Sequence, residues 1–315
     1  MNAAAQELSS PLRVDFCGLA LSSPIVLLSG CVGFGEEYTR VDGFSNRDVG
    51  AIVLKGTTGK ARLGNKPHRV YETPGGMLNA IGLQNIGAQA FLEEKLPHLR
   101  QLKNIVVMTN VFGYAREDYE RTIEILNEGE GIAAYELNVS CPNTAHGGLQ
   151  FGSDPRSLDE VVTTVKRVAR RPLIVKLSPN VTSIAQMAYV AQEAGADALS
   201  LVNTFVAMAI DPETRKPRIA NVTAGLSGPA IKPIAVRMVY DAAHAVKIPV
   251  IGMGGISTPE DVIEFMLAGA TAVQIGTASY WDPCATEKIV DGVEQWCKER
   301  HVTRIADLIG GMQLE

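Results

Sequence analysis

The chain has 315 residues, of which 46% are hydrophobic and 20% charged, with a net charge of −5 and a pI near 5.7. This acidic balance, with no basic run that could follow a phosphate backbone, argues against nucleic acid as a partner. The longest apolar stretches fall well short of the ~20 residues of a membrane helix, so we expect no membrane association. The first residues lack a basic segment followed by an apolar core, so we expect no secretory signal.

The cysteines are dispersed, and no two of them form a C-x-x-C pair. Their number is odd, and they stand at positions Cys17, Cys31, Cys141, Cys284 and Cys297. Such a set is typical of a reducing compartment and argues against an iron–sulfur cluster or a structural zinc in this chain. The five His are equally dispersed. We therefore expect a cytoplasmic protein with no bound metal.

Taken in order, the chain predicts a short hairpin over residues 11–22 and then eight buried strands. Each strand is a short, nearly continuous apolar run, which is typical of parallel strands covered on both faces. The predicted strands span 24–30, 51–55, 104–110, 133–138, 172–177, 198–203, 249–253 and 272–276.

Helical patterns separate these strands. Apolar residues recur at i, i+3, i+4 and i+7 from Ile184, which predicts an amphipathic helix. Thr258, Pro259 and Asp261 form a good helix start, and Gly269 fits the position just after that helix ends. Repeated strand–helix units with eight strands predict a TIM (β/α)8 barrel, with residues 1–315 as a single domain.

One connection is too long for a simple loop between a strand and its helix. It covers residues 56–86, after the second strand. We expect this insertion to cap the site, because long connections in compact domains usually serve a function.

Nearly every predicted strand ends in a polar residue or glycine. In a TIM barrel the carboxyl ends of the strands form the functional face, so this repetition predicts a site there. The residues concerned are Ser29 with Gly30, Lys55, Asn110, Asn138, Lys176, Asn203, Gly254 with Gly255, and Gly276 with Thr277.

Two kinds of residue within this set suggest an anionic ligand. A single lysine after an apolar strand could reach solvent, but Lys55 and Lys176 close two separate strands and suggest a shared anion. The glycine pairs follow the seventh and eighth strands, where this fold usually holds phosphate with backbone N–H groups.

The loop after the fourth strand, Glu136–Asn143, is the strongest single candidate for chemistry. It places Cys141 between side-chain amides, which can read the donor and acceptor edge of a heterocycle. A thiol acts as a base near neutral pH if its surroundings favour the thiolate. In the insertion, Asn79 is a candidate further amide.

The motifs Met77–Asn85, Asn138–Asn143 and Ile251–Ile256 together resemble those of the dihydroorotate dehydrogenases, and the similarity covers nearly the whole chain. The resemblance implies a barrel that binds FMN and oxidises dihydroorotate to orotate in pyrimidine synthesis. Class 1 members use a Cys base, which corresponds to Cys141. Class 2 members use Ser and carry an N-terminal hydrophobic extension that is not found here.

Within class 1, the stretches His146–Gly152 and Leu226–Pro233 resemble subgroup B. This implies a catalytic subunit that passes electrons to NAD⁺ through a partner carrying FAD and a [2Fe–2S] cluster. The implied assembly is a heterotetramer of two catalytic and two electron-transfer subunits.

The resemblance also implies residue roles. Cys141 would take a proton from C5 of dihydroorotate while C6 gives hydride to FMN, and Lys176 would stabilise negative charge on the flavin. The substrate would contact Lys55, Asn79, Ile81, Gly82, Leu83, Asn138, Asn143, Asn203 and Thr204. FMN would contact Ser29, Gly30, Lys55, Thr57, Asn110, Asn138, Lys176, Val202, Gly228, Gly254, Gly255, Gly276 and Thr277.

Four alternatives stay open at the level of sequence. The first is the same reaction with fumarate in a homodimer, and the second is a dihydropyrimidine dehydrogenase-like reaction. The third is an aldolase-like barrel in which Lys176 forms a Schiff base, and the fourth is a non-catalytic barrel that binds a metabolite. Bound flavin would exclude the last two.

Overall fold

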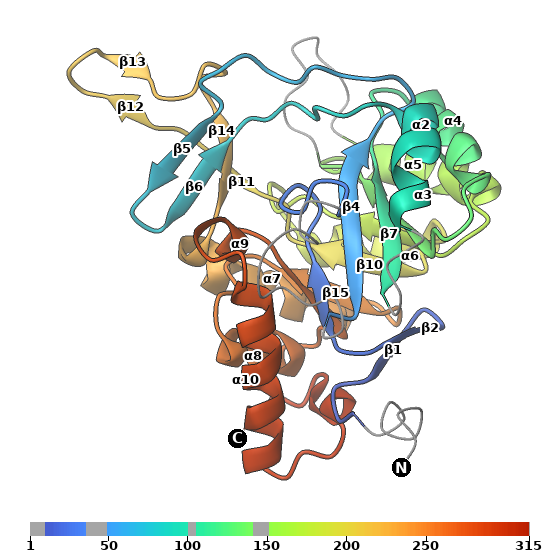
Figure 1. Ribbon diagram of the computed structural model, residues 1–315, viewed down its shortest axis with the longest axis vertical. Helices are drawn as coiled ribbons and strands as arrows, with labels where there is room; N and C mark the ends of the chain where they lie inside the picture. The colour runs from blue at the N-terminus through green and yellow to red at the C-terminus, as the bar shows by residue number, and fades with distance from the viewer. Residues whose placement is uncertain (1–9, 36–48, 100–104, 141–150, 315) are drawn as a thin grey trace.

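The computed structural model describes residues 10–35, 49–99, 105–140 and 151–314. Eight parallel strands close into a barrel, and they follow one another around it in sequence order (Figure 1). The predicted eight-stranded barrel is therefore confirmed. Its strands are β3 (Ile25–Leu27), β4 (Ala51–Thr57), β7 (Val106–Val111), β8 (Ala134–Asn138), β9 (Leu173–Lys176), β10 (Ala198–Leu201), β15 (Val250–Met253) and β16 (Ala272–Ile275).

Helices alternate with these strands and cover the outside of the barrel (Figure 1). The longer ones are α4 (Arg116–Asn127), α5 (Pro155–Val168), α6 (Ile184–Glu193), α7 (Lys232–Ala245), α8 (Pro259–Leu267) and α10 (Ala285–Glu299). The shorter segments are α2 (Ala88–Ala90), η3 (Phe91–Lys95), α3 (Leu96–Leu99), η4 (Pro229–Ile231), α9 (Ala278–Trp281) and η5 (Ile305–Leu308).

The local signals for α6 and α8 are confirmed. Helix α6 begins at Ile184, and the four apolar residues of its predicted face are all buried. At the start of α8, the Thr258 hydroxyl accepts from Asp261 N–H, and the Asp261 carboxylate accepts from Thr258 N–H. Gly269 follows the helix with φ of +116°, a conformation that glycine adopts without strain.

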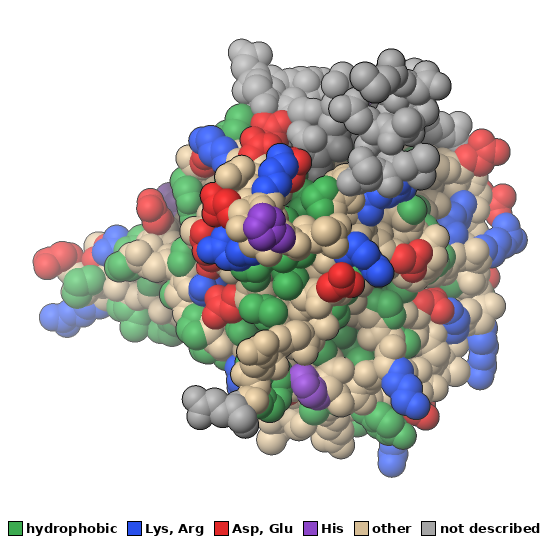
Figure 2. All heavy atoms as spheres, turned by 90° about the horizontal axis from the view of Figure 1, so that it is seen from below, with side chains coloured by type: hydrophobic (Ala, Val, Ile, Leu, Met, Phe, Trp, Pro, Cys, Tyr) green, Lys and Arg blue, Asp and Glu red, His purple; other side chains and the backbone are tan. Residues whose placement is uncertain are grey.

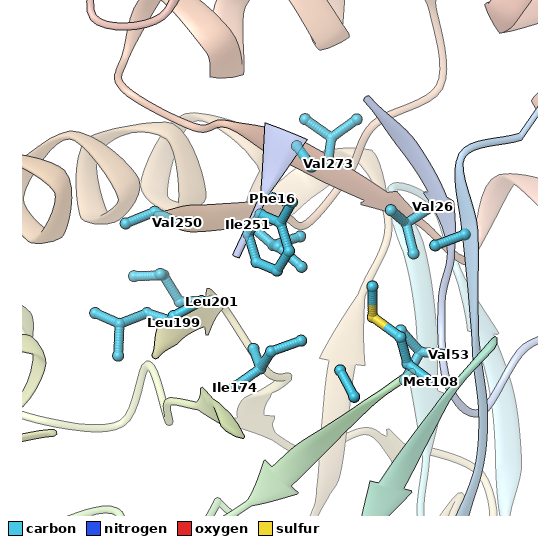
Figure 3. Packing of buried hydrophobic residues seen from close by; sticks show 14 of the residues in the cluster. Phe16, Val26, Val53, Met108, Ile174, Leu199, Leu201, Val250, Ile251 and Val273 are labelled. Atoms are coloured by element: carbon cyan, nitrogen blue, oxygen red, sulfur yellow. The ribbon is translucent and has the colours of Figure 1, made fainter. Parts of the chain in front are cut away.

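A single large apolar core joins the barrel, the helices and the N-terminal hairpin. The hairpin consists of β1 (Val14–Phe16) and β2 (Leu19–Leu21), and Phe16 is fully buried in the same cluster as the barrel side chains. Figure 3 shows Phe16 beside Ile251 and among other side chains of the barrel strands, such as Val26 and Ile174. The predicted hairpin is thus confirmed, and it contributes an aromatic side chain to the core.

The insertion after β4 forms a second hairpin, β5 (Val70–Thr73) and β6 (Gly76–Asn79). It is half of a four-stranded antiparallel sheet that also contains β14 (Ala224–Ser227) and β11 (Phe205–Ala207). We call this four-stranded sheet the cap. The second half comes from the connection after β10, which the sequence patterns did not predict to be structured.

The connection after β10 also carries a two-stranded arm, β12 (Ile210–Asp211) and β13 (Lys216–Pro217), which projects from the cap (Figure 1). Its turn is held by the Asp211 carboxylate, which accepts from the backbone N–H groups of Glu213 and Thr214. These hydrogen bonds hold the pKa of Asp211 below its usual value. The strands of this connection have two to four residues, too few for an alternating pattern to be read.

Acidic and basic side chains are interspersed on the molecular face seen in Figure 2, without a large area of one sign. Within the described residues, no helix has both the length and the apolar character needed to cross a membrane.

The cap has a small apolar cluster of its own, so its disruption should leave the barrel largely intact. At Gly76 an added Cβ would lie 1.9 Å from the Ser227 carbonyl oxygen, across the β6–β14 pairing. We predict that Gly76→Val lowers the free energy of unfolding by about 1–3 kcal/mol, the usual range for overpacking. Urea denaturation measures the loss, and limited proteolysis followed by peptide mapping should show faster cleavage within residues 60–80.

Gly59→Ala in the same insertion is the matched control, because its Cβ would meet only the Thr122 hydroxyl, at 3.4 Å. A Gly76→Val protein cleaved no faster than Gly59→Ala would contradict the structural role assigned to the β6–β14 pairing.

Candidate active site

A cavity of about 980 Å³ lies at the carboxyl ends of the barrel strands, beneath the cap. Its wall combines strand-end residues from all eight barrel strands or the loops that follow them with residues of β6 and β14. This is the position at which the fold places its functional sites.

Most of the residues predicted for the site line this one cavity. The structure brings together Ser29, Gly30, Lys55, Asn79, Ile81, Gly82, Leu83, Asn110, Asn138, Lys176, Val202, Asn203, Thr204, Gly254, Gly255, Gly276 and Thr277. Cys141 and Asn143 lie outside the described residues. Ser140, which directly precedes Cys141 in the sequence, lines the cavity.

Two predicted residues stand just behind the wall. The Thr57 hydroxyl donates to the backbone oxygen of Lys55 at 3.0 Å and is buried there. Gly228 packs against Gly76, where an added Cβ would come within 2.5 Å of the Gly76 Cα. Its neighbours Ser227 and Pro229 do line the cavity.

The two predicted lysines both face the cavity but differ in environment. Lys176, at the end of β9, is buried, and its Nζ lies 3.7 Å from the Glu136 carboxylate oxygen Oε2. Lys55 in β4 is half-buried. A ligand in the cavity would therefore meet one ammonium group already balanced by a carboxylate and a second that is closer to solvent.

The side-chain amides of Asn138, in β8, and Asn203, after β10, are hydrogen-bonded to each other. Asn138 Oδ1 accepts from the Ser140 hydroxyl at 2.9 Å and from Asn203 Nδ2 at 3.3 Å, and Asn203 also donates to the Ser140 hydroxyl. Asn203 Oδ1 accepts from Thr204 N–H. Because Asn138 uses its oxygen within this network, its amide nitrogen is the group that it can offer to a ligand.

The glycines after β15 form a close turn beside the loop at Gly228. Gly254 and Gly255 have φ of +127° and +80°, a region that favours glycine. An added Cβ at Gly255 would lie 2.8 Å from the Gly228 carbonyl oxygen and 2.9 Å from the Lys232 Cβ. Glycine is required at both positions of this turn, because a side chain at either one would collide with neighbouring atoms.

Comparison with protein families matches residues 11–296 to the family described as Dihydroorotate dehydrogenase. The chain belongs to the dihydroorotate dehydrogenase family. This confirms the resemblance drawn from the sequence motifs.

Individual relatives match along almost their whole length. A protein of Solibacter usitatus, provisionally named dihydroorotate dehydrogenase A (fumarate), is 52% identical over 302 residues, covering 96% of this chain and 98% of that one. The dihydroorotate dehydrogenase B (NAD(+)) catalytic subunits of Geotalea uraniireducens and Geobacter sulfurreducens are 50% and 49% identical, with the same coverage.

A solved structure shares the fold. The DHODH of Eimeria tenella, crystallised with ferulenol, superimposes with a TM-score of 0.79 at 22% identity, covering 96% of this chain and 88% of that one. It supports the architecture of the dihydroorotate dehydrogenase barrel described above.

Sequence reasoning assigned no role to three polar residues at the dihydroorotate dehydrogenase cavity, although two of them lie in the candidate loop Glu136–Asn143. Ser140 and Gln274 line the cavity, and Glu136 lies buried behind it and holds Lys176. The signal for Glu136 was available, since an acidic residue in an apolar strand stands two positions before Asn138 and so faces the same side of β8.

The thiol of Cys31 lines the cavity. Burial raises its pKa to about 11, against the smaller lowering effects of the Tyr280 hydrogen bond and of Lys176 and Lys55. Cys31 therefore stays protonated near neutral pH and is a poor candidate for a base. Within the described part of the chain, no three His, Cys, Asp or Glu side chains gather where they could hold a metal ion.

Proposed function

We propose that this chain oxidises (S)-dihydroorotate to orotate in pyrimidine biosynthesis, with one FMN bound in the cavity. The observation that carries the proposal is the convergence of Lys55, Lys176 and four asparagine amides on a single cavity under the cap. That combination suits a flat heterocycle with a carboxylate, and the family of the chain names a substrate of this kind.

The residues present fit FMN. Gly254 and Gly255 line the cavity just after β15, where this fold usually holds a phosphate with backbone N–H groups. Gln274 Oε1 is buried without a hydrogen-bond partner among the described residues, so it is an acceptor that a ring N–H could satisfy. FMN, when bound, supplies the hydride acceptor for the reaction.

We assign the flavin site to the strand-end set predicted from the sequence. Its phosphate would contact Gly228, Gly254, Gly255, Gly276 and Thr277. The remaining flavin contacts would come from Ser29, Gly30, Lys55, Thr57, Asn110, Asn138, Lys176 and Val202.

The substrate would be held between the barrel and the cap. Asn79 belongs to β6 and reaches the cavity from the cap side, whereas Asn138 and Asn203 approach from the strand ends. These amides, with Asn143 and Thr204, would bind the pyrimidine edge, and Lys55 would neutralise the carboxylate. Ile81, Gly82 and Leu83 would close the mouth and exclude water.

Cys141 is the proposed base for the C5 proton. It stands directly after the wall residue Ser140, and the thiol of Cys31 is a poor alternative because its pKa is raised. Cys141 stands between Asn138 and Asn143 in the sequence, so it would be placed next to the bound ring.

For the electron acceptor we propose NAD⁺, reached through a partner subunit that carries FAD and a [2Fe–2S] cluster. The sequence has no G-x-G-x-x-G between a strand and a helix and no cysteine spacing for a cluster, so those functions require a second protein. The Geotalea and Geobacter relatives named as catalytic subunits support this assignment. We propose a cytoplasmic heterotetramer with two subunits of each kind.

The Solibacter relative favours a second candidate, in which fumarate is the acceptor and the enzyme is a homodimer. The two candidates share the oxidation of dihydroorotate and differ in the electron acceptor and in the assembly.

The base assignment predicts the behaviour of Cys141 variants. Cys141→Ala should keep FMN bound but lower steady-state oxidation by about 10²-fold or more, the usual scale for removal of a general base. Cys141→Ser should retain a little activity, with its optimum at higher pH, because a hydroxyl is a poorer base. Cys31→Ala is the matched control and should keep most of the turnover. Wild-type turnover by Cys141→Ala would remove Cys141 from the mechanism.

The acceptor assignment predicts that the isolated chain oxidises dihydroorotate with artificial dyes but not with NAD⁺. Adding the FAD and iron–sulfur protein should make NAD⁺ an efficient acceptor. The assay compares NAD⁺ and fumarate, each with and without that protein. Efficient turnover with fumarate by the chain alone would replace the first candidate by the homodimeric one.

A further inference from the structure

Glu136 is a fully buried carboxylate inside the barrel, and it is contacted by side chains from four other strands. Its Oε1 accepts from Ser200 Oγ of β10 at 2.9 Å and from Gln274 Nε2 of β16 at 2.7 Å. Its Oε2 accepts from Asn110 Nδ2 of β7 at 2.6 Å and lies 3.7 Å from Lys176 Nζ of β9. One acidic group of β8 thus links five of the eight barrel strands beneath the cavity.

An ionised carboxylate can only accept hydrogen bonds, and this fixes the orientation of its neighbours. Asn110 and Gln274 must turn their N–H₂ groups toward Glu136, so their carbonyl oxygens are directed elsewhere. Both residues line the cavity, and the Gln274 carbonyl oxygen has no partner among the described residues. The Asn110 oxygen faces Gly56, where an added Cβ would lie 2.9 Å away.

The same carboxylate balances Lys176, whose side chain is only 6% exposed. A buried ammonium needs a charged or hydrogen-bonding partner, and a buried carboxylate without a cation is equally unfavourable. Glu136 therefore holds the ammonium in place and offsets its charge. The position of the Lys176 ammonium and the balance of its charge would both affect a ligand bound in the cavity.

We propose that Glu136 is a positioning residue that sets the electrostatics of the flavin site. It lies buried behind the cavity wall and balances the charge of the Lys176 ammonium, which lines the cavity. The inference rests on the proposed function, in that the ligand is taken to be FMN. In this account the carboxylate keeps the positive charge near the flavin low, and so keeps reduced FMN ready to give up its electrons.

The test is the two-electron reduction potential of the FMN bound to Glu136→Gln, measured by slow enzymatic reduction against a reference dye. Gln keeps the size of the side chain and removes its charge, so the uncompensated Lys176 should favour reduced FMN. We expect the ratio of reduced to oxidised flavin at a fixed poise to rise by about tenfold, a positive shift of about 30 mV for a two-electron couple. A potential unchanged from wild type would overturn the proposal.

Ser200→Ala is the matched control, because it removes one hydrogen bond to the same carboxylate and leaves the charge in place. It should shift the urea midpoint without moving the potential. An equal shift of the potential in Ser200→Ala would show that packing, and not the charge of Glu136, sets the flavin environment.

A second measurement needs neither flavin nor the single Glu136 variant. Urea denaturation of the flavin-free protein compares Lys176→Gln with the Lys176→Gln/Glu136→Gln double variant. Because the single change leaves a buried carboxylate without its ammonium, the double variant should have the higher urea midpoint. A lower midpoint for the double variant would contradict the coupling.

The potential measurement uses no dihydroorotate, so the two proposals can fail separately. A flavoprotein whose potential depends on Glu136 but which dihydroorotate does not reduce would overturn the function alone. A wild-type chain that cannot bind FMN would overturn both.

Discussion

The pairing of β16 with β3 closes the barrel, and the site depends on that closure. Val273, Gln274 and Ile275 stand beside Ile25, Val26 and Leu27 in parallel register, so the first and last strands of the barrel meet in one sheet. Closure brings all eight carboxyl strand ends to a single rim. Lysines, amides and glycines that are far apart in the sequence then face one cavity, because they lie at or just after the carboxyl ends of the barrel strands.

Closure also creates an interior in which polar groups must satisfy one another. Glu136 and Lys176 are both buried, and breaking such a pair by removing one partner typically destabilises a protein by about 3–5 kcal/mol. Ser200, Asn110 and Gln274 complete the hydrogen bonds of the carboxylate. The contacts that satisfy Glu136 also fix the orientation of the Asn110 and Gln274 amides beneath the cavity.

The barrel and much of the cavity wall could be predicted because their signals are local. Lys55 and Lys176 each close an apolar run, and the Thr258–Asp261 capping pair is visible within four residues of sequence. The cap could not be predicted in full, because β11 and β14 are too short to show a period and pair with strands far away in the sequence. The position of Glu136 on the inner face of β8 could be predicted, but its partners could not, since its hydrogen bond to Gln274 joins residues 138 positions apart. For Cys141 and Asn143, which lie outside the described residues, the assigned roles remain predictions.

The most direct test of the central claim is an anaerobic titration of the purified, flavin-loaded wild-type chain with dihydroorotate. The account predicts loss of the oxidised-flavin absorbance at one equivalent per chain, with orotate as the product. Dihydrouracil, which has no carboxylate for Lys55 to neutralise, should leave the absorbance unchanged on the same time scale. A chain that retains no flavin, or a flavin that dihydrouracil reduces as readily as dihydroorotate, would contradict the account.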